Sequence, residues 1–264
     1  MRRFTAEYLE ATREGMWADS RSALVDLELE RCDRILDVGA GTGELTAVLR
    51  EESSGEVIAL DADMALLART PPPRVAGDAT RLPFADDSVD LVVCQALLVN
   101  LPDPVEAVAE FARVSRNRVA VIEPDNSAVS VESTVEIESR LAERARRLYV
   151  DGADTDPTVG DARELFAAAG LEDVTVRRYD HERTTQPPYS ERELEAARRK
   201  ASGAGIDSDR ETILAGETTP ETFDSIREQW RAMGRKTIKQ IQDGSYERTE
   251  TVPFYVTVGR VDNS

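Results

Sequence analysis

Two patterns of apolar positions alternate along the chain. Short runs of mostly apolar residues, bounded by glycine, proline or charged residues, are typical of strands buried on both faces of a parallel sheet. Between these runs, apolar residues recur at spacings of three and four, which is the period of a helix packed on one side. This alternation predicts an α/β fold, in which helices cover both faces of a doubly wound sheet.

The same pattern places most of the elements. We expect strands over residues 35–38, 57–60, 88–93, 119–122, 171–179 and 252–261. We expect helices over residues 4–29 with a break at Gly15, 64–68, 105–114, 127–150 and 161–169, a glycine joint over 202–205, and further helices that begin at Ser190 and Thr219. Ser190 with Glu193 forms a capping box, and Pro220 suits the first position of a helix.

The first predicted strand runs directly into a glycine-rich turn and a helix. Residues 35–45 are Ile-Leu-Asp-Val-Gly-Ala-Gly-Thr-Gly-Glu-Leu. Glycine lets a ligand approach the bare backbone, and a helix N-terminus attracts polar groups, so this unit is a candidate ligand cradle. A dinucleotide fingerprint needs glycine at position 44, where Glu44 would instead repel a pyrophosphate. We therefore expect a nucleoside without phosphates, with a tight turn that binds nothing as the alternative.

A carboxylate also follows the second predicted strand. Asp61 lies 18 residues after Gly43, and an acidic residue at this place can accept hydrogen bonds from ribose hydroxyls. Asp63 is expected to cap the short helix that follows, and Met64 is a candidate to pack on the base of the nucleoside. Two features that suit one nucleoside thus lie at the same edge of the predicted sheet.

Residues 37–43, Asp-Val-Gly-Ala-Gly-Thr-Gly, resemble the first motif of the class I S-adenosylmethionine-dependent methyltransferases. Residues 77–93, which begin Gly-Asp-Ala-Thr-Arg-Leu-Pro-Phe and end Asp-Leu-Val-Val, closely resemble the motifs that follow in that family. The resemblance covers roughly residues 34–180 and is nearest to the small-molecule methyltransferases of types 11 and 25. It implies a seven-stranded mixed sheet whose last strand is antiparallel, S-adenosylmethionine as the cofactor, S-adenosylhomocysteine as its product, and a small-molecule methyl acceptor.

The resemblance also assigns residues to the cofactor. It implies that Asp78 accepts a hydrogen bond from the adenine amino group, and that the Ala79 amide meets a ring nitrogen. The implied cofactor-binding residues are Asp37, Gly39, Ala40, Gly41, Gly43, Asp61, Ala62, Met64, Asp78, Ala79, Gln95 and Leu98. In related enzymes the N-terminal segment often covers the cofactor, so Tyr8, Arg13 and Trp17 are lid candidates. Arg13 could pair with the cofactor's carboxylate, and packing alone is the alternative role for the two aromatic residues.

The resemblance implies one domain over residues 1–264. Its parts are a helical lid (1–30), a cofactor-binding core (31–180), a helical cap inserted over the substrate pocket (181–249) and the last strand (250–264). A helix pair packed on the sheet edge is the alternative for the insert. Methyl transfer mainly needs an aligned acceptor and excluded water, so the chemistry requires no particular catalytic residue. His181, the single histidine, is the candidate base for an acceptor hydroxyl.

Charge and composition narrow the set of partners. The net charge is −18, from 51 acidic and 33 basic residues, so neither nucleic acid nor an anionic membrane is expected as a partner. Such acidity with few lysines resembles proteins of salt-loving archaea, and an acidic mesophilic protein is the alternative. With 2 cysteines and 1 histidine, we expect no metal site. The charged N-terminus is unlike a signal peptide, so we expect a cytoplasmic protein. We also expect a monomer or homodimer.

Two other functions fit much of the same sequence. A non-catalytic S-adenosylmethionine-binding or regulatory protein would need the same binding residues. An NAD-dependent oxidoreductase is disfavoured by Glu44, and ultraviolet spectra of ligand-soaked protein would distinguish it.

Overall fold

The computed structural model describes residues 5–13 and 15–262, without the side chains of residues 7, 8, 10, 11 and 19. The chain divides into two compact units. Unit 1 comprises Met1–Asp125, Val159–Tyr179 and Phe254–Ser264, and unit 2 comprises Asn126–Thr158 and Asp180–Pro253. Two long strands, β7 (Glu172–Thr185) and β8 (Arg248–Arg260), each contribute residues to both units.

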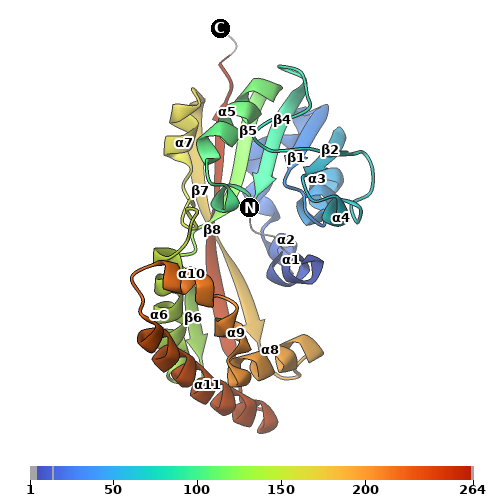
Figure 1. The fold of residues 1–264 in the computed structure, drawn as a ribbon. Coiled ribbons are helices and arrows are strands. Elements are labelled where there is room, and N and C mark those ends of the chain that lie inside the picture. The colour runs from blue at the N-terminus through green and yellow to red at the C-terminus, as the bar shows by residue number, and fades with distance from the viewer. Residues whose placement is uncertain (1–4, 14, 263–264) are drawn as a thin grey trace. The chain divides into compact units, whose positions relative to one another are not determined.

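Unit 1 is built on a mostly parallel sheet (Figure 1). Its parallel strands are β1 (Arg34–Val38), β2 (Glu56–Asp61), β3 (Arg74–Ala76), β4 (Val89–Gln95) and β5 (Ser115–Pro124). They lie in the order β3-β2-β1-β4-β5, and β8 pairs antiparallel with β5. The carboxyl ends of β1, β2 and β4 therefore lie along one edge, which is where open parallel sheets bind their ligands.

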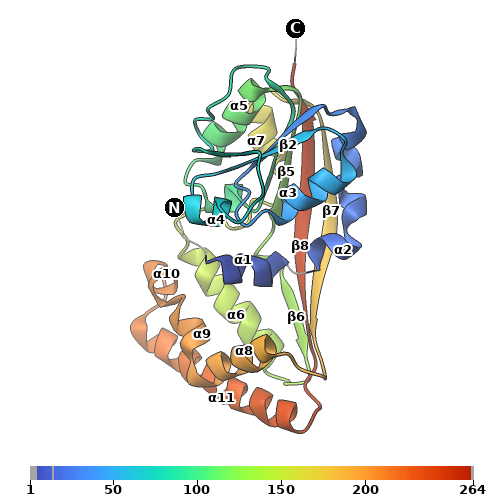
Figure 2. The same cartoon turned by 90° about the vertical axis from the view of Figure 1, so that its right-hand side faces the viewer.

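Helices cover both faces of this sheet (Figures 1 and 2). The helices of unit 1 are α1 (Ala6–Arg13), α2 (Met16–Asp19), α3 (Glu44–Glu52), α4 (Met64–Leu67), α5 (Pro104–Val114) and α7 (Arg163–Ala168), with 3₁₀ turns η1 (Arg21–Leu27), η2 (Leu29–Arg31) and η3 (Leu98–Asn100). Among them, α1 lies at the carboxyl edge of the sheet, against the turn after β1. Neighbouring residues of β1 point to opposite faces. Ile35 packs in one core cluster with Leu49 of α3, whereas Leu36 packs in the other with Phe111 of α5. Burial on both faces explains the continuous apolar runs, and the predicted doubly wound fold is confirmed.

Unit 2 combines an antiparallel sheet with a helical layer. Its helices are α6 (Glu138–Asp151), α8 (Glu191–Ser202), α9 (Ala204–Asp207), α10 (Arg210–Ala215) and α11 (Pro220–Gln242). The strand β6 (Ser130–Ser133) pairs antiparallel with β8, so the path β3-β2-β1-β4-β5-β8-β6 ends here, and β7 pairs with β8 beside it. Figure 2 shows α6 between these strands and the other helices. The apolar face of α11, with Phe223, Ile226 and Met233, packs in the core of this unit.

Several predictions of secondary structure are wrong in part. Residues 127–150 do not form one helix, because 130–133 alternate in burial and pair with β8, and α6 begins only at Glu138. After the break at Gly15, the second N-terminal helix is mostly a 3₁₀ turn, η1, which Glu28 ends with a φ of 48°. At the expected glycine joint, α8 and α9 are connected by Gly203 alone, which adopts a φ of 89° and caps both helices.

Candidate functional site

The turn after β1 has a backbone that only glycine adopts without strain. Gly39 and Gly41 have φ values of 73° and 58°, in the left-handed region. A Cβ at Gly39 would lie 2.9 Å from Leu97 Cδ1, and one at Gly41 would lie 3.0 Å from Leu9 Cδ1. The Gly39 amide donates to the Leu60 carbonyl at 2.8 Å, which ties the turn to the end of β2. The turn is therefore closely packed, because side chains from α1 and from the loop after β4 lie against its glycines.

Asp61 connects this turn to the end of β2. Its Oδ2 accepts the Gly41 amide at 2.7 Å, and its Oδ1 accepts the Asp63 amide at 2.7 Å. A carboxylate has about four acceptor positions, so each oxygen can accept a further hydrogen bond from a ligand hydroxyl. Asp63 caps α4 by accepting from Ala65 and Leu66, as expected. The two carboxylates thus have separate tasks, and Asp61 is the one that faces the glycine turn.

Asp37 lies inside unit 1, where its side chain is 1% exposed. The Thr46 hydroxyl of α3 donates to its Oδ2 at 2.5 Å. Burial raises the pKa of Asp37 to about 6, against the opposing effect of that hydrogen bond. Two further candidates, Ala40 and Gly43, close the turn through a 2.9 Å hydrogen bond from the Gly43 amide to the Ala40 carbonyl. Asp37 therefore fixes the turn from behind by joining β1 to α3.

The candidate adenine contacts lie beyond β2 and β3. Ala62 and Met64 are exposed, Met64 by 65%, beside the end of β2. Asp78 is also exposed, and its Oδ1 accepts both the amide and the hydroxyl of Thr80 at 2.9 Å. Ala79 is buried, 6% exposed. The exposed residues among these are free to contact a planar ring, and Asp78 keeps its second carboxylate oxygen for an amino group.

Gln95, the last residue of β4, and Leu98, in the loop that follows, both lie in the interior. Gln95 is 4% exposed, and its Nε2 donates to Met16 Sδ at 3.0 Å. Its Oε1 is buried and has no hydrogen-bond partner among the described residues. A buried carbonyl oxygen without a donor is costly, so it marks a place where a ligand N–H or O–H would be stabilised. Leu98 is fully buried and packs in the core behind the loop.

Arg13, the lid candidate from α1, reaches the same place. Its side chain is 9% exposed, and its Nη1 lies 3.4 Å from Glu44 Oε2 at the start of α3. Its Nη2 donates to the Gln95 carbonyl at 3.5 Å. A Cβ on Gly41 would lie 3.5 Å from the Arg13 Nη1. The guanidinium thus stands over the glycine turn, with long and adjustable hydrogen bonds.

The remaining candidates lie elsewhere. Tyr8 belongs to α1, and its side chain is outside the described part of the chain. Trp17 is 6% exposed and packs edge-on against Phe254, with ring centroids 6.4 Å apart. His181 is 8% exposed in the part of β7 that belongs to unit 2. The structure places Trp17 in the core of unit 1, which is the packing role considered for it.

One buried acid at this edge is not among the predicted site residues. Glu123, near the end of β5, is fully buried, and its carboxylate accepts the amides of Leu97, Leu98 and Val99. Burial raises the pKa of Glu123 to about 7, because lost hydration outweighs these hydrogen bonds. A glutamate that follows an unbroken apolar strand is the signal that could have indicated it.

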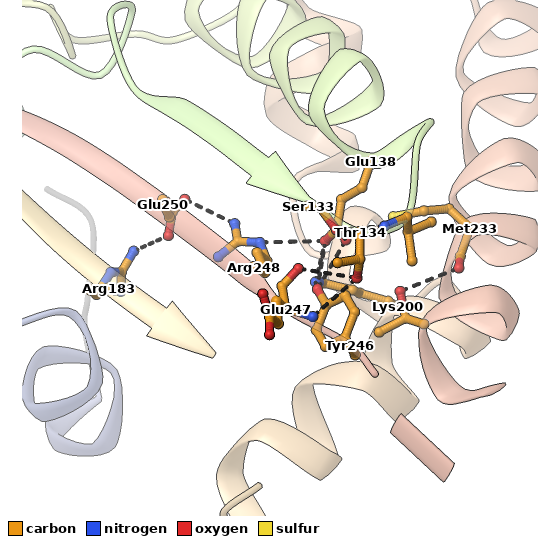
Figure 3. A network of polar contacts seen from close by, with 12 residues as sticks. Ser133, Thr134, Glu138, Arg183, Lys200, Met233, Tyr246, Glu247, Arg248 and Glu250 are labelled. Carbon is orange, nitrogen blue, oxygen red and sulfur yellow. Dashed lines mark hydrogen bonds and ion pairs between the residues drawn. The ribbon is translucent and has the colours of Figure 1, made fainter. Parts of the chain in front are cut away.

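Unit 2 holds a separate cluster of charges (Figure 3). Glu138 of α6, which is 2% exposed, accepts from Lys200 Nζ and from the Tyr246 hydroxyl. Arg248 lies 3.4 Å from Glu138 and 3.3 Å from Glu250. Burial opposes ionisation of Glu138, but Lys200 and its other donors outweigh it and leave the pKa of Glu138 below its usual value. This cluster, whose carboxylates are matched with cations, has the character of structural ion pairing.

Other kinds of site find no support in the part of the chain that the structure describes. No group of three or more His, Cys, Asp and Glu residues is arranged there to hold a metal ion. None of the helices within that part combines the length and the apolar character needed to cross a membrane.

A doubly wound sheet with a glycine turn after β1 and an acid after β2 is the arrangement of class I methyltransferases. Residues 36–122, all within unit 1, match the family model described as a methyltransferase domain of type 11. The match assigns residues 36–122 to a methyltransferase domain, and these residues lie within the stretch that resembles the class I methyltransferases.

Curated relatives cover part of the chain. Over 104 residues it is 42% identical to the demethylmenaquinone methyltransferase of Mycobacterium sp. (strain KMS), a match that covers 36% of this chain and 45% of that protein. Over 117 residues it is 35% identical to the demethylmenaquinone methyltransferase of Beutenbergia cavernae, covering 42% of this chain and 48% of that protein. The chain thus spans slightly less than half the length of these relatives.

Solved structures match over almost the whole chain. A Bacillus halodurans protein superposes with a TM-score of 0.54 at 15% identity, covering 93% of this chain and 100% of that one. The YcgJ protein of Bacillus subtilis gives a TM-score of 0.51 at 18% identity, covering 92% and 99%. At such low identity these matches establish the fold alone.

Proposed function

We propose that the protein is an S-adenosylmethionine-dependent methyltransferase that acts on a small-molecule acceptor. The observation that carries the proposal is Asp61, which accepts the Gly41 amide at 2.7 Å at the shared edge of β1 and β2. Bare backbone and a carboxylate with spare acceptor positions, side by side, suit a ribose without phosphates. Glu44 beside this turn disfavours the pyrophosphate of a nicotinamide cofactor, which supports the choice.

The residues around this edge fit the cofactor in three parts. Asp61 would hold the ribose hydroxyls, and the exposed Met64 and Asp78 would meet the adenine. The buried Gln95 Oε1 would accept from the cofactor's ammonium group. Arg13 would exchange its 3.4 Å contact with Glu44 for the cofactor's carboxylate, a stronger and bidentate partner. Each part thus has a group of matching polarity.

The contacts of α1 with the glycine turn also suggest how the cofactor would be covered and water excluded. When bound, S-adenosylmethionine supplies an electrophilic methyl group, so the protein needs to align the acceptor and exclude water. Leu9 and Arg13 of α1 lie against Gly41, so this helix must move to admit the cofactor and can then cover it. We include residues 1–30 as this lid and residues 181–249 as a cap. His181, in unit 2, remains the candidate base for a hydroxyl acceptor.

For the acceptor, the curated relatives suggest a starting point. Both are named demethylmenaquinone methyltransferases, so a demethylated quinone precursor is the first acceptor to screen, followed by small acids and amines. The net charge of −18 supports a small molecule over nucleic acid. We further propose a cytoplasmic protein that acts as a monomer or homodimer.

Calorimetric titration in molar salt tests the cofactor. We expect S-adenosylmethionine and S-adenosylhomocysteine to bind with micromolar affinity, and NAD not to bind. Asp61→Ala should weaken binding by about 1–3 kcal/mol, because ribose hydroxyls lose a charged acceptor. Asp161→Ala is the matched control, since that exposed acid of unit 1 accepts the Arg163 amide at the start of α7, outside the candidate site, and should leave the affinity unchanged. Equal affinities for wild type and Asp61→Ala would refute the site.

A second pair of variants tests the glycine turn. Gly41→Val should abolish binding, because its Cβ would meet Leu9 and occupy the ligand's approach. Gly170→Val is the control: its φ of 74° imposes comparable strain, but a Cβ there meets no atom of the described chain within 4 Å. Binding that survives Gly41→Val would place the cofactor elsewhere. Binding of the cofactor without turnover of any acceptor would favour a non-catalytic, regulatory protein.

A further inference from the structure

The loop over residues 95–100 has an unusual conformation for its sequence. Ala96 adopts a φ of 49°, in the left-handed region that residues with a Cβ rarely occupy. Its amide donates to the Ile122 carbonyl of β5 at 2.9 Å, and its carbonyl accepts from Asn100 Nδ2 at 2.9 Å. Strained residues of this kind persist only where the surroundings hold them firmly.

Glu123 accepts most of the hydrogen bonds that fix this loop. Its Oε1 accepts the amides of Leu97 and Leu98, both at 2.9 Å, and its Oε2 accepts the amide of Val99 at 3.3 Å. Consecutive backbone donors from one loop therefore converge on a single carboxylate. The Cys94 thiol lies 3.7 Å from Oε1. Because Glu123 is fully buried, no water competes with these donors.

The held loop touches the candidate cofactor site at more than one point. Leu97 lies so close to Gly39 that a Cβ there would clash with its side chain at 2.9 Å. The Gln95 carbonyl accepts from Arg13, and the Gln95 amide group donates to Met16. A change in the backbone path of residues 97–99 would therefore move both the Leu97 side chain beside Gly39 and the Gln95 groups that contact Arg13 and Met16.

We propose that Glu123 is a positioning residue: its carboxylate fixes residues 95–100 against the glycine turn. It thereby sets the geometry of the methionine pocket, the place beside Gln95 and Arg13 that is proposed for the methionine part of the cofactor. The effect on the cofactor rests on the proposed function, whereas the fixing of the loop does not. The residue touches neither cofactor nor acceptor, and it acts through Leu97 and Gln95.

The chemistry of the side chain makes the proposal specific. Only a carboxylate offers two acceptor oxygens and no donor, so it can satisfy all of these amides at once. Glutamine has the same shape, but its one carbonyl oxygen can serve Leu97 and Leu98 while its amide group opposes the N–H of Val99. Alanine removes every acceptor. A graded series of Glu, Gln and Ala at position 123 is therefore expected, in which the conservative variant rescues part of the effect.

The experiment measures loop and ligand separately. Wild type, Glu123→Gln, Glu123→Ala and the control Glu138→Gln are compared by residue-resolved amide exchange and by S-adenosylhomocysteine titration at about pH 8. We expect exchange at residues 97–99 to be about ten-fold faster in Glu123→Gln and faster again in Glu123→Ala, with ligand dissociation constants that rise in the same order. Glu138→Gln, an equally buried acid in unit 2, should lower the melting temperature without either effect.

Each outcome either supports or overturns the role of Glu123. Unchanged exchange at 97–99 in both Glu123 variants would overturn the proposal, as would faster exchange spread evenly over unit 1, which would indicate a general loss of stability. Faster local exchange with wild-type ligand affinity would overturn the link to the methionine pocket. If the wild type itself binds no S-adenosylhomocysteine, the proposed function fails, and the exchange data still decide whether Glu123 holds the loop.

Discussion

Glu123 in unit 1 and Glu138 in unit 2 are almost equally buried, at 0% and 2% exposure, but they are stabilised in different ways. Glu123 has backbone amides and a thiol around it and no ion-pair partner in the described part of the chain, and burial raises its pKa to about 7. Glu138 has Lys200 beside it, and its pKa is lowered. Burial disfavours both charges, and only in unit 2 does an opposite charge outweigh it.

The difference in partners distinguishes the candidate functional site in unit 1 from the structural ion pairs in unit 2. In unit 1 the acids at the strand ends, Asp61 and Glu123, hold backbone amides of the turn and of the loop that line the candidate site. Burial of Glu123 without an opposite charge opposes its ionisation, and such perturbed acids are concentrated at functional sites. In unit 2 the acids hold side chains from α8 and β8, which joins helices to strands without lining a known pocket. An acid without a cation partner is thus the better indicator of function in this chain.

The largest expected effect concerns the matched charges of unit 2. Glu138→Ala should lower the free energy of unfolding by about 3–5 kcal/mol, because Lys200 and Arg248 would remain buried without their carboxylate. Denaturant unfolding at neutral pH measures this loss. Glu136→Ala, an exposed neighbour, is the control and should stay close to wild type. A loss below about 1 kcal/mol in Glu138→Ala would mean that the cluster is a solvated surface feature.

The sequence predicted the features that depend on nearby residues. The glycine turn and Asp61 could be placed because a strand, its turn and the following helix are continuous in the chain. An acid after an apolar run could have drawn attention to Glu123, but its partners could not be predicted, because they lie in a loop that begins more than twenty residues earlier and folds back onto it. β6 was missed for the same reason, since its partner residues lie at 248–251. Contacts between distant segments leave no periodic pattern in a single sequence.

The next expected effect is a difference in pH dependence between the two acids. Glu123 keeps its proton in the native state up to about pH 7, whereas the unfolded chain loses it near the ordinary glutamate pKa of 4.5. Wild type should therefore lose about 3 kcal/mol of stability relative to Glu123→Gln as the pH rises through that window. Paired unfolding curves across the window measure this difference, and curves that stay parallel would contradict it.

Glu138 should show the opposite behaviour. Its native pKa is lowered, so its contribution is complete above the unfolded value of 4.5 and is lost only as the pH falls below it. The difference between wild type and Glu138→Gln should therefore stay constant from about pH 5 to 8 and shrink in acid. A shared slope for both variants near neutrality would remove the distinction between the two acids.

The smallest expected effect tests Asp37, which is buried like the other two acids and accepts a hydrogen bond from the Thr46 hydroxyl. Thr46→Val keeps the shape of a fully buried side chain and removes the donor. The loss should be about 2 kcal/mol at about pH 8, where the carboxylate is ionised, and about 1 kcal/mol below its pKa of about 6, where it carries a proton. Since the lost bond favours the ionised form, the mutation should also raise the pKa of Asp37 further, which carboxyl NMR can follow. A pH-independent loss would mean that Asp37 is already neutral in the native protein, and that burial alone, without the cation that Glu138 has, decides its charge.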